Sequence, residues 1–344
     1  MGVGATKSGS ARRVAVGLPV YNGQNYLRDA IESILAQSYG DFRLIITDNC
    51  STDATQDICR EYAAQDPRIE YHRHHENIGA APNFNSCFEL AGGRGGDAKA
   101  EYFKWAAHDD VLGKDFLKVC VERMDADPKL ALVHTLSVRI DKDRKTVGTY
   151  DSEFPLDGPR AHERFYRTLW VDHFTEIWGL MRTSCLKRTI LYGSFIGSDR
   201  TLLAEMLLQG DIGYIPEYHF FRRDHAENYC NSQRTAEDRM KWFDPKKKNT
   251  KLRNAPAKVW YYLAAIGRLP MPMSERVACA SMLAGWGWRR IADYAKGKQL
   301  TRPQIAVGPR GESLQVPELP PQGQSLFNGT KSNGVVAGVP SFTL

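Results

Sequence analysis

The chain has 344 residues, of which 42% are hydrophobic and 25% charged. This is ordinary globular composition for about two domains, and it excludes a wholly disordered or fibrous protein. The net charge of +6 is mild for this length. It is compatible with an anionic substrate or a membrane surface, and we expect no nucleic-acid partner.

The cysteines and the first residues bear on the cellular compartment. Seven cysteines are scattered along the chain without a Cys-x-x-Cys pair, which favours reduced thiols over a disulfide or zinc framework. The Gly/Ser-rich, basic first 13 residues have no apolar core like that of a signal peptide. No run of about 18 apolar residues predicts a membrane span. We therefore expect a cytoplasmic protein.

The first 140 residues alternate between short apolar runs and segments with helical spacing. Apolar residues at positions 27, 30, 31, 34 and 35 predict one helix face, and residues 51–53 offer N-cap side chains for a helix through 58–62. The predicted strands are 14–20, 42–47, 69–71, 102–105 and 130–138, and the other predicted helices are 82–91 and 114–126. This alternation predicts an α/β fold with a doubly wound, mostly parallel sheet.

The pattern after residue 138 is mixed. It predicts a polar hairpin at 139–148, strands at 177–182, 212–215 and 219–222, a helix at 198–208 and helical structure over 235–298. The Gly-, Pro- and Ser-rich residues after 299 predict a disordered tail. The expected division is a disordered N-terminus (1–12), a main domain (13–232) in two halves (13–110 and 111–232), a helical extension (233–298) and the tail (299–344).

Three polar segments, 19–22, 48–49 and 108–110, follow predicted parallel strands. Ligands of such sheets bind beyond the carboxyl ends of the strands. Asp109 and Asp110 could hold a divalent cation that neutralises a diphosphate, or could form a polar turn before a helix. Asp48 could accept hydrogen bonds from a base or ribose, or could be a turn residue.

Several later residues have two interpretations each. Asp199 could be a general base on a loop or a helix-capping residue. His225 could ligate a metal or simply be solvated, and Arg222 and Arg223 could face phosphates or an exposed edge. Trp178 could stack on a sugar or lie in the core.

The histidines at 72, 74 and 75 suggest a metal cluster, but no cysteine or carboxylate arrangement completes a zinc site.

Taken together, the motifs resemble those of family 2 glycosyltransferases with the GT-A fold, a Rossmann-like architecture. The resemblance covers roughly residues 14–225, and it implies that 13–232 is the catalytic domain, with a nucleotide half (13–110) and an acceptor half (111–232). It rests on Val16–Asn22, Tyr26-Leu27, Ile31–Ser38, Asp48–Asp53, Asn77-Ile78-Gly79 with Asn83, and His108-Asp109-Asp110.

The resemblance implies an inverting transfer of one sugar from a nucleotide diphosphate donor, UDP-linked by family habit, to an acceptor hydroxyl. The matching positions imply that Pro19, Tyr21, Asp48 and Asp109 hold the donor nucleotide, that Asp110 and more loosely His225 bind Mn²⁺ or Mg²⁺, and that Asp199 is the general base. Arg222, Arg223 and Trp178 are candidates for phosphate or acceptor contacts. The acceptor would be a carbohydrate or a lipid-linked glycan, as in bacterial polysaccharide, glycolipid or cell-surface glycan synthesis.

Two departures from the family pattern are Ala107, where many members carry Asp, and Asn49, where the second Asp is usual. The Gln-x-x-Arg-Trp motif of processive members is absent, which favours transfer of a single sugar. A non-catalytic relative that binds a nucleotide sugar or glycan is the alternative interpretation. A sugar nucleotidyltransferase fits less well, because the loop at 19–22 lacks its Gly-rich, Arg- and Lys-bearing sequence. A dehydrogenase lacks its Gly-x-Gly-x-x-Gly motif.

The helical C-terminal region also has two interpretations. Its basic clusters, with Trp286 and Trp288 beside Arg289 and Arg290, could contact an anionic membrane surface. Alternatively, the tryptophans are buried in a small helical subdomain with a solvated basic face.

Overall fold

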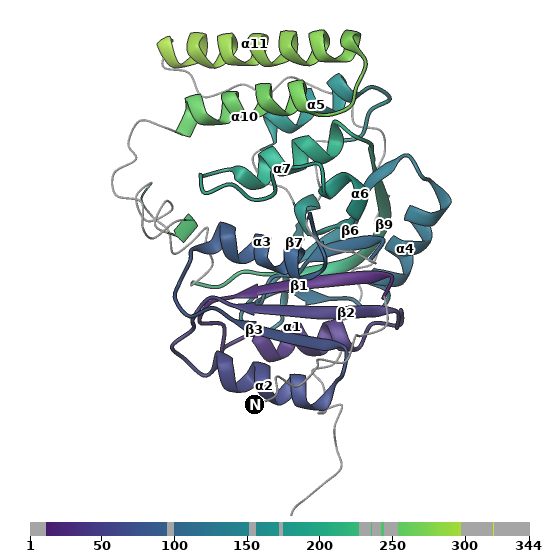
Figure 1. Cartoon of the computed structure of the whole chain (residues 1–344), viewed down its shortest axis with the longest axis vertical. Helices are drawn as coiled ribbons and strands as arrows, with labels where there is room; N and C mark the ends of the chain where they lie inside the picture. The colour runs from purple at the N-terminus through teal and green to yellow at the C-terminus, as the bar shows by residue number, and fades with distance from the viewer. Residues whose placement is uncertain are drawn as a thin grey trace, which may run out of the picture.

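The computed structural model describes residues 12–94, 100–150, 156–171, 175–226 and 254–296, with the single positions Thr235, Trp242, Phe243 and Leu319. A nine-stranded sheet runs through its centre (Figure 1). Along one path the strand order is β3 (Ile69–Arg73), β2 (Phe42–Asp48), β1 (Val14–Val20), β4 (Tyr102–Trp105), β8 (Leu180–Arg182), β6 (Leu130–Ile140), β9 (Asp211–Arg223) and β5 (Val111–Leu112). Strand β7 (Thr146–Tyr150) pairs with β6 off this path.

The two halves of the sheet differ in strand direction. Strands β3, β2, β1 and β4 are parallel, whereas β8 is antiparallel to both β4 and β6. Beyond it, β9 is parallel to β6 and β5 is antiparallel to β9. The predicted parallel sheet is therefore confirmed for the first half and becomes mixed in the second.

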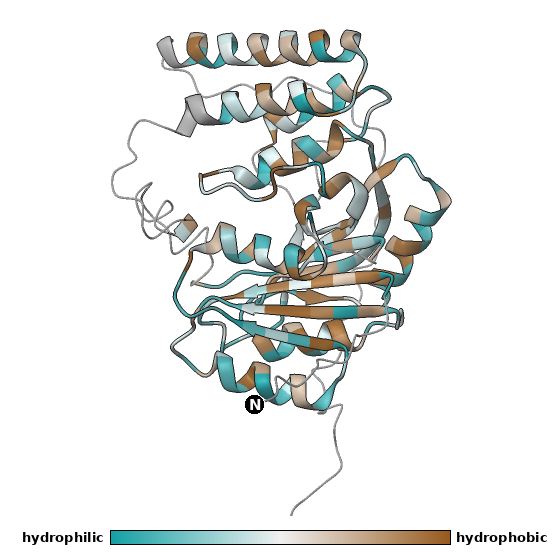
Figure 2. Ribbon diagram, in the orientation of Figure 1, coloured by the Kyte–Doolittle hydropathy of each residue, from teal (hydrophilic) through white to brown (hydrophobic). Residues whose placement is uncertain are grey.

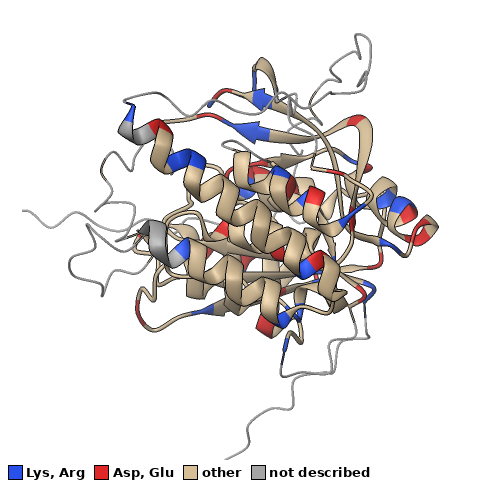
Figure 3. Ribbon diagram, turned by 90° about the horizontal axis from the view of Figure 1, so that it is seen from above, with Lys and Arg blue, Asp and Glu red and all other residues tan. Residues whose placement is uncertain are grey.

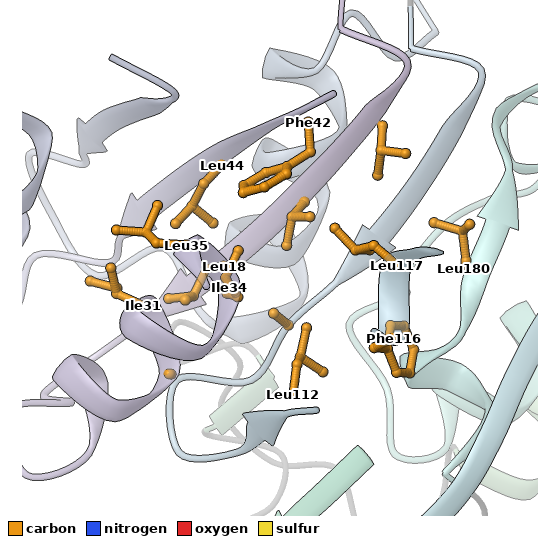
Figure 4. Packing of buried hydrophobic residues seen from close by; sticks show 14 of the residues in the cluster. Leu18, Ile31, Ile34, Leu35, Phe42, Leu44, Leu112, Phe116, Leu117 and Leu180 are labelled. Atoms are coloured by element: carbon orange, nitrogen blue, oxygen red, sulfur yellow. The ribbon is translucent and has the colours of Figure 1, made fainter. Parts of the chain in front are cut away.

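Strand β1 lies at the core because both of its faces are covered. All seven of its residues are buried, as expected for a central parallel strand. Its alternating side chains enter two clusters: Val16 and Leu18 pack with α1 (Leu27–Leu35), α2 (Thr55–Gln65) and α4 (Phe116–Ala126), whereas Ala15 faces the other side. Figure 4 shows the first cluster, and Figure 2 shows the hydrophobic strands between more polar helices.

The second face of the sheet carries α3 (Ala80–Leu90), α6 (Thr183–Leu186) and α7 (Ser198–Leu207). Helix α7 is apolar on two sides, since Leu203 and Leu207 pack toward the sheet and Ala204 packs away from it. That outer side is covered by α5 (Ala161–Trp170), α10 (Asn254–Arg268) and α11 (Met273–Ala295). These helices form a further layer above the sheet in Figure 1.

Most elements expected over residues 14–148 are confirmed, including the hairpin, and several later predictions are wrong. The strands predicted at 212–215 and 219–222 form the single strand β9, because a register shift against β6 skips Pro216 and Glu217. A bulge of this kind accommodates a residue without an N–H group. The strand predicted at 177–182 begins only at Leu180, after a 3₁₀ turn at Glu176–Trp178.

The predicted cap of α2 is also different. The N-cap position is Ala54, which has no capping side chain, although Asp53 Oδ1 accepts a hydrogen bond from the Thr55 amide. Helices α5 and α6 and strand β5 were not predicted. The predicted disordered termini, except for Arg12 and Leu319, and the basic cluster at 246–248 lie outside the described residues. The domain boundaries remain a prediction.

We expect Phe165→Ala to lower the free energy of unfolding by about 3 kcal/mol, because it opens a cavity between α5 and α10. Phe165 is fully buried and packs edge-on against Tyr262, with ring centroids 5.5 Å apart. Urea unfolding followed by circular dichroism measures the loss. Val147→Ala, at an exposed position of β7, is the control and should change the free energy by less than about 0.5 kcal/mol. Equal effects would contradict the packing described for the helical layer.

Candidate functional site

Three loops meet at the carboxyl ends of β2, β1 and β4, which are adjacent and parallel. Val20 is paired with Asp48 in the sheet, and the Asn49 amide donates to the Val20 carbonyl at 2.9 Å. A Cβ atom on Gly23 would lie 2.8 Å from the ring of His108. The loop after β1 can therefore approach the loop after β4 this closely only with glycine at position 23. The structure confirms the predicted convergence of the three polar segments.

The loop after β1 is held by side chains of the loop after β2. The amides of residues 22, 23 and 24 donate to Ser51 Oγ, Thr55 Oγ1 and Asp53 Oδ2 at 2.8–3.1 Å. Residues 51–55 thus fix the backbone of the neighbouring loop in addition to starting α2. Tyr21 remains 45% exposed beside this fixed backbone, and Pro19 is buried within β1.

Asp48 is fully buried and organises the end of β2. Its Oδ1 accepts the Ser51 amide at 2.8 Å, and its Oδ2 accepts the Tyr71 hydroxyl at 2.8 Å and pairs with Arg73 Nε at 3.2 Å. A base could contact this carboxylate only by displacing one of these partners. Asn49 is held in turn by Asn77 Oδ1 and the Ile78 amide, which gives the Asn77-Ile78-Gly79 motif a role in shaping the loop.

Asp109 and Asp110 follow β4 and have different surroundings. Asp109 Oδ2 lies 2.9 Å from His225 Nε2, and Asp110 Oδ1 accepts the Arg223 amide at 2.9 Å. Burial pushes the pKa of Asp109 up, but the charges of His108 and His225 and the hydrogen bond from His225 outweigh it, so that pKa is lowered. Burial and the adjacent Asp109 charge raise the pKa of Asp110 to about 8.

This arrangement provides oxygen donors for a hard divalent cation. Asp109 Oδ1 and Asp110 Oδ2 accept no side-chain hydrogen bond within the described part of the chain. A cation between them would counter the Asp109 charge that, after burial, raises the pKa of Asp110, and carboxylate oxygens suit Mg²⁺ or Mn²⁺. His225 contacts Asp109 through Nε2, so it would act as a ligand through Nδ1 or after leaving Asp109. No cluster of three or more His, Cys, Asp or Glu side chains suited to a metal occurs among the described residues.

Arg223 is the buried centre of the contacts around this pair. Its Nε donates to the Asp109 carbonyl at 2.8 Å and its Nη2 to Asp29 Oδ2 at 2.9 Å, while its guanidinium lies over the Tyr26 ring at 4.6 Å. Arg144 pairs with the same Asp29 oxygen at 3.3 Å. With 1% of its surface exposed, Arg223 could contact a phosphate only by giving up these partners. Arg222 beside it is half-buried.

Asp199 lies in the first turn of α7, after Gly197 in the left-handed conformation (φ 83°). Its Oδ1 accepts a hydrogen bond from the amide of the next residue, Arg200, at 2.8 Å, and the N-cap position itself has no capping side chain. Burial raises the pKa of Asp199, and the Arg200 amide and the charges of Arg200 and Lys258 oppose part of the rise. Asp199 is therefore a half-buried carboxyl that holds a proton more strongly than an ordinary aspartate.

The remaining candidates lie in other surroundings. Trp178 is half-buried on its 3₁₀ turn, 6.2 Å from Phe84 between ring centroids, and packs against both main core clusters. His72 and His75 are exposed, whereas His74 is half-buried with a pKa lowered chiefly by burial.

Several residues of the site were not singled out in the sequence. They are Asp29 and Arg144 around Arg223, Tyr71 and Arg73 on Asp48, and Lys258 near Asp199. Asp29 resembles an ordinary acidic residue in the first helical turn. Its two arginine partners lie more than a hundred residues away in sequence, and no local pattern indicates them.

Comparison with known proteins supports one family. The model of "Glycosyl transferase family 2" matches residues 15–189, about half of the chain. TuaG of Bacillus subtilis (strain 168), assigned as a teichuronic acid biosynthesis glycosyltransferase, is 39% identical over 111 residues, which are 32% of this chain and 41% of TuaG. Matches to seven other curated relatives cover 13–27% of their lengths.

Two solved structures share the fold. TarS 1–349 of Staphylococcus aureus, solved with UDP-GlcNAc, superposes with a TM-score of 0.52 at 16% identity, covering 83% of this chain and 92% of that one. The mannosyltransferase PcManGT of Pyrobaculum calidifontis, solved with GDP-Man and Mn²⁺, gives 0.50 at 16% identity, covering 85% and 77%.

We expect Arg223→Met to cost about 3 kcal/mol of folding free energy, because it leaves the Asp109 carbonyl without its donor and half-buried Asp29 with Arg144 as its remaining arginine partner. Guanidinium unfolding measures the loss. Arg139→Met on the neighbouring strand breaks the more exposed pair with Asp224 and should cost less than about 1 kcal/mol. A loss for Arg223→Met no larger than that of Arg139→Met would show that Arg223 does not hold the site together.

Proposed function

The chain belongs to glycosyl transferase family 2, and from this premise we propose that it transfers one sugar, with inversion, from a nucleotide diphosphate donor to an acceptor hydroxyl. The observation that carries the proposal is the pair Asp109–Asp110. It lies beside the loops after β1 and β2, at the edge where parallel sheets bind nucleotides.

The donor nucleotide would lie across the ends of β2, β1 and β4. Pro19 and the exposed ring of Tyr21 would lie at the base and ribose, Asp48 would stand beside the base while it holds the Ser51 amide, and Asp109 would lie near the ribose and diphosphate. The neighbours were solved with UDP-GlcNAc and with GDP-Man. We propose a UDP-sugar as the donor and test it against the other nucleotides.

Asp110 and His225 are the proposed protein ligands of a divalent cation, with Asp109 beside them. When bound, Mn²⁺ or Mg²⁺ would offset the charge of the departing nucleoside diphosphate. Arg222 is the remaining arginine candidate for a phosphate, since Arg223 is engaged within the protein. The neighbour PcManGT was solved with Mn²⁺, which supports this assignment.

Asp199 is the proposed general base. It takes the proton of the acceptor hydroxyl as that oxygen bonds to the anomeric carbon, while the bond from this carbon to the diphosphate oxygen breaks. Its raised pKa makes it a stronger base than an exposed aspartate. Trp178 is a candidate for acceptor contact, because it is half-buried near the aromatic residues Phe84 and Tyr192.

The biological setting is proposed at the level of class. The acceptor is a carbohydrate or a lipid-linked glycan, and the product belongs to bacterial polysaccharide, glycolipid or cell-surface glycan synthesis at the cytoplasmic side of the membrane. The curated relative TuaG is assigned to teichuronic acid biosynthesis, which is consistent with this setting. Residues 13–232 would form the catalytic domain and 233–298 a helical extension.

We expect one of UDP, GDP and dTDP to bind at least about tenfold more tightly with Mn²⁺ than with EDTA, because a cation shields diphosphate from Asp109 and Asp110. Isothermal titration calorimetry on the wild type and Asp110→Asn measures the difference. The metal-dependent gain should disappear in Asp110→Asn and persist in Asp57→Asn, which changes an exposed carboxylate of α2. Binding without any metal effect would contradict the cation site, and no nucleotide binding would contradict the transferase.

We expect Asp199→Asn to reduce nucleotide release from the donor sugar at least about 100-fold, because the base is lost, with nucleotide affinity changed less than about twofold. Activity of the wild type should fall as pH drops through the raised Asp199 pKa, since only the ionised carboxylate accepts a proton.

The Lys258→Met variant tests whether the ionisation of Asp199 controls the pH dependence of activity. It removes a positive charge that stabilises ionised Asp199, so the acid limb of kcat/KM should move to higher pH. Loss of nucleotide binding in Asp199→Asn, or an unmoved limb in Lys258→Met, would indicate that Asp199 has a structural role only.

A further inference from the structure

The exposed apolar side chains of the molecule gather on its helical layer. Of the nine large hydrophobic residues that are strongly exposed in the described part of the chain, six lie on α10 and α11: Trp260, Leu263, Met273, Val277, Trp288 and Ile291. Trp260 is 68% exposed and Trp288 is 75% exposed. Concentrations of apolar surface of this kind mark interaction sites.

The spacing of these residues places them on continuous helix faces. On α11, Met273, Val277, Ala284, Trp288 and Ile291 recur at helical intervals and are all exposed. On α10, Trp260, Leu263 and Gly267 follow the same spacing. The two helices pack against each other through their opposite faces. Figure 3 shows both crossing the face seen from above, with long stretches that carry no charge.

The C-terminal end of α11 is basic, with Arg289, Arg290 and Lys296 exposed against half-buried Asp293. The other basic residues of 254–296 are engaged within the protein: Arg268 pairs with Glu205, Arg276 donates to carbonyls at the end of α10, and Lys258 packs at Gly197. Arg289 and Arg290 are exposed next to Trp288, and their guanidinium groups lie over Trp170 and Trp286 rather than on a carboxylate of the described residues. Trp286 itself is buried in the cluster below, so of the two tryptophans noted in the sequence only Trp288 is available for contact.

We propose that this face, defined by Trp260, Leu263, Met273, Val277, Trp288 and Ile291, docks on an anionic membrane surface, with Arg289 and Arg290 against lipid headgroups. Indole rings favour the interfacial zone of a bilayer, and basic residues add attraction to anionic lipids. Within the described residues no helix is long and apolar enough to cross a bilayer, so the helices would lie along the surface.

A second copy of the chain fits the face less well. In a two-fold dimer the face would meet itself, so each copy would have to supply carboxylates for the other's arginines. The two carboxylates of residues 254–296 are poorly placed for this role. Glu275 is engaged by His162, and Asp293 is half-buried.

Docking here would bring the proposed base close to the membrane. The loop before α7 is attached to α10 by stacking of Phe195 on Tyr261, at 4.4 Å between ring centroids. A Cβ atom on Gly197 would lie 2.6 Å from Lys258 Nζ. Since Lys258 and Trp260 are two residues apart, the end of α10 that supports the Asp199 loop also carries the exposed indole. A membrane-anchored acceptor follows from this placement, and that consequence alone rests on the proposed function.

Flotation of the full chain with phosphatidylcholine vesicles, with and without phosphatidylglycerol, tests the docking surface. Wild type should float with anionic vesicles and much less with neutral ones, and high salt should weaken binding. Trp260→Ser/Trp288→Ser should lose at least about tenfold in bound fraction. The matched control Leu90→Ser/Val147→Ser removes exposed apolar residues from α3 and β7 and should bind like wild type.

Metal-dependent nucleotide binding, measured on the same variants, should be unchanged and separates failure of this proposal from failure of the transferase function. Absence of wild-type binding to anionic vesicles, or equal binding by both double variants, would overturn the docking surface. Self-association by light scattering that Trp260→Ser/Trp288→Ser abolishes, without vesicle binding, would overturn it in favour of a second copy.

Discussion

The repulsion between two neighbouring carboxylates, half-buried Asp109 and buried Asp110, is the constraint around which the proposed nucleotide-binding edge is built. The chain meets it by bringing the end of β9 back to β5, where Val111 pairs with Phe221 and the Arg223 amide reaches Asp110. Arg223 is then itself a buried charge, and Asp29 balances it from α1. Each of these charged groups has lost contact with water, so each needs the next one as a partner within the protein. The antiparallel strand β5, two residues long, therefore matters more to the site than its length suggests.

The need to surround Asp109 and Asp110 with partners also explains why the sheet changes from parallel to mixed strand directions beyond β4. Four parallel strands align the ends of β1, β2 and β4, and the loops there can reach one ligand. A continued parallel sheet would leave the Asp109–Asp110 pair open on its other side. The long strand β9 instead runs along β6, shifts register at Pro216, and carries Arg223 and His225 to that side. The mixed half is thus the part of the fold that covers the other side of the Asp109–Asp110 pair, which is the proposed cation site.

The amino-acid sequence predicts those features that depend on neighbours along the chain. Strand β1 is a run of seven mostly apolar residues, and the carboxyl ends of parallel strands converge, so sequence alone assigns Asp48, Asp109 and Asp110 to one edge of the sheet. The partners of these groups are not predictable in this way. From sequence alone, Arg223 could equally be an exposed residue at the edge of the sheet. Only the structure shows that it is buried and paired with Asp29, 194 residues earlier in the chain. The ion pair between Arg73 and Asp48 depends likewise on which segments pack together. So does the burial of Trp286 beside the exposed Trp288. Local sequence does not encode these long-range choices.

The environment of Asp199 shows how the helical layer acts on the chemistry. A carboxylate in the first turn of a helix is normally stabilised by the helix dipole and by cap hydrogen bonds. Here Asp199 accepts a hydrogen bond from the Arg200 amide, which lowers its pKa. The effect of burial is larger and in the opposite direction, so the pKa of Asp199 rises. The positive charge of Lys258 on α10 opposes part of this rise. Burial lowers the pKa of Lys258 itself. Burial and Arg200 therefore contribute most to the strength of the proposed base, and α10, outside the segment matched by the family model, adds one opposing charge. The same helix carries the exposed Trp260, so the proposed docking surface and a charge that acts on Asp199 share one element.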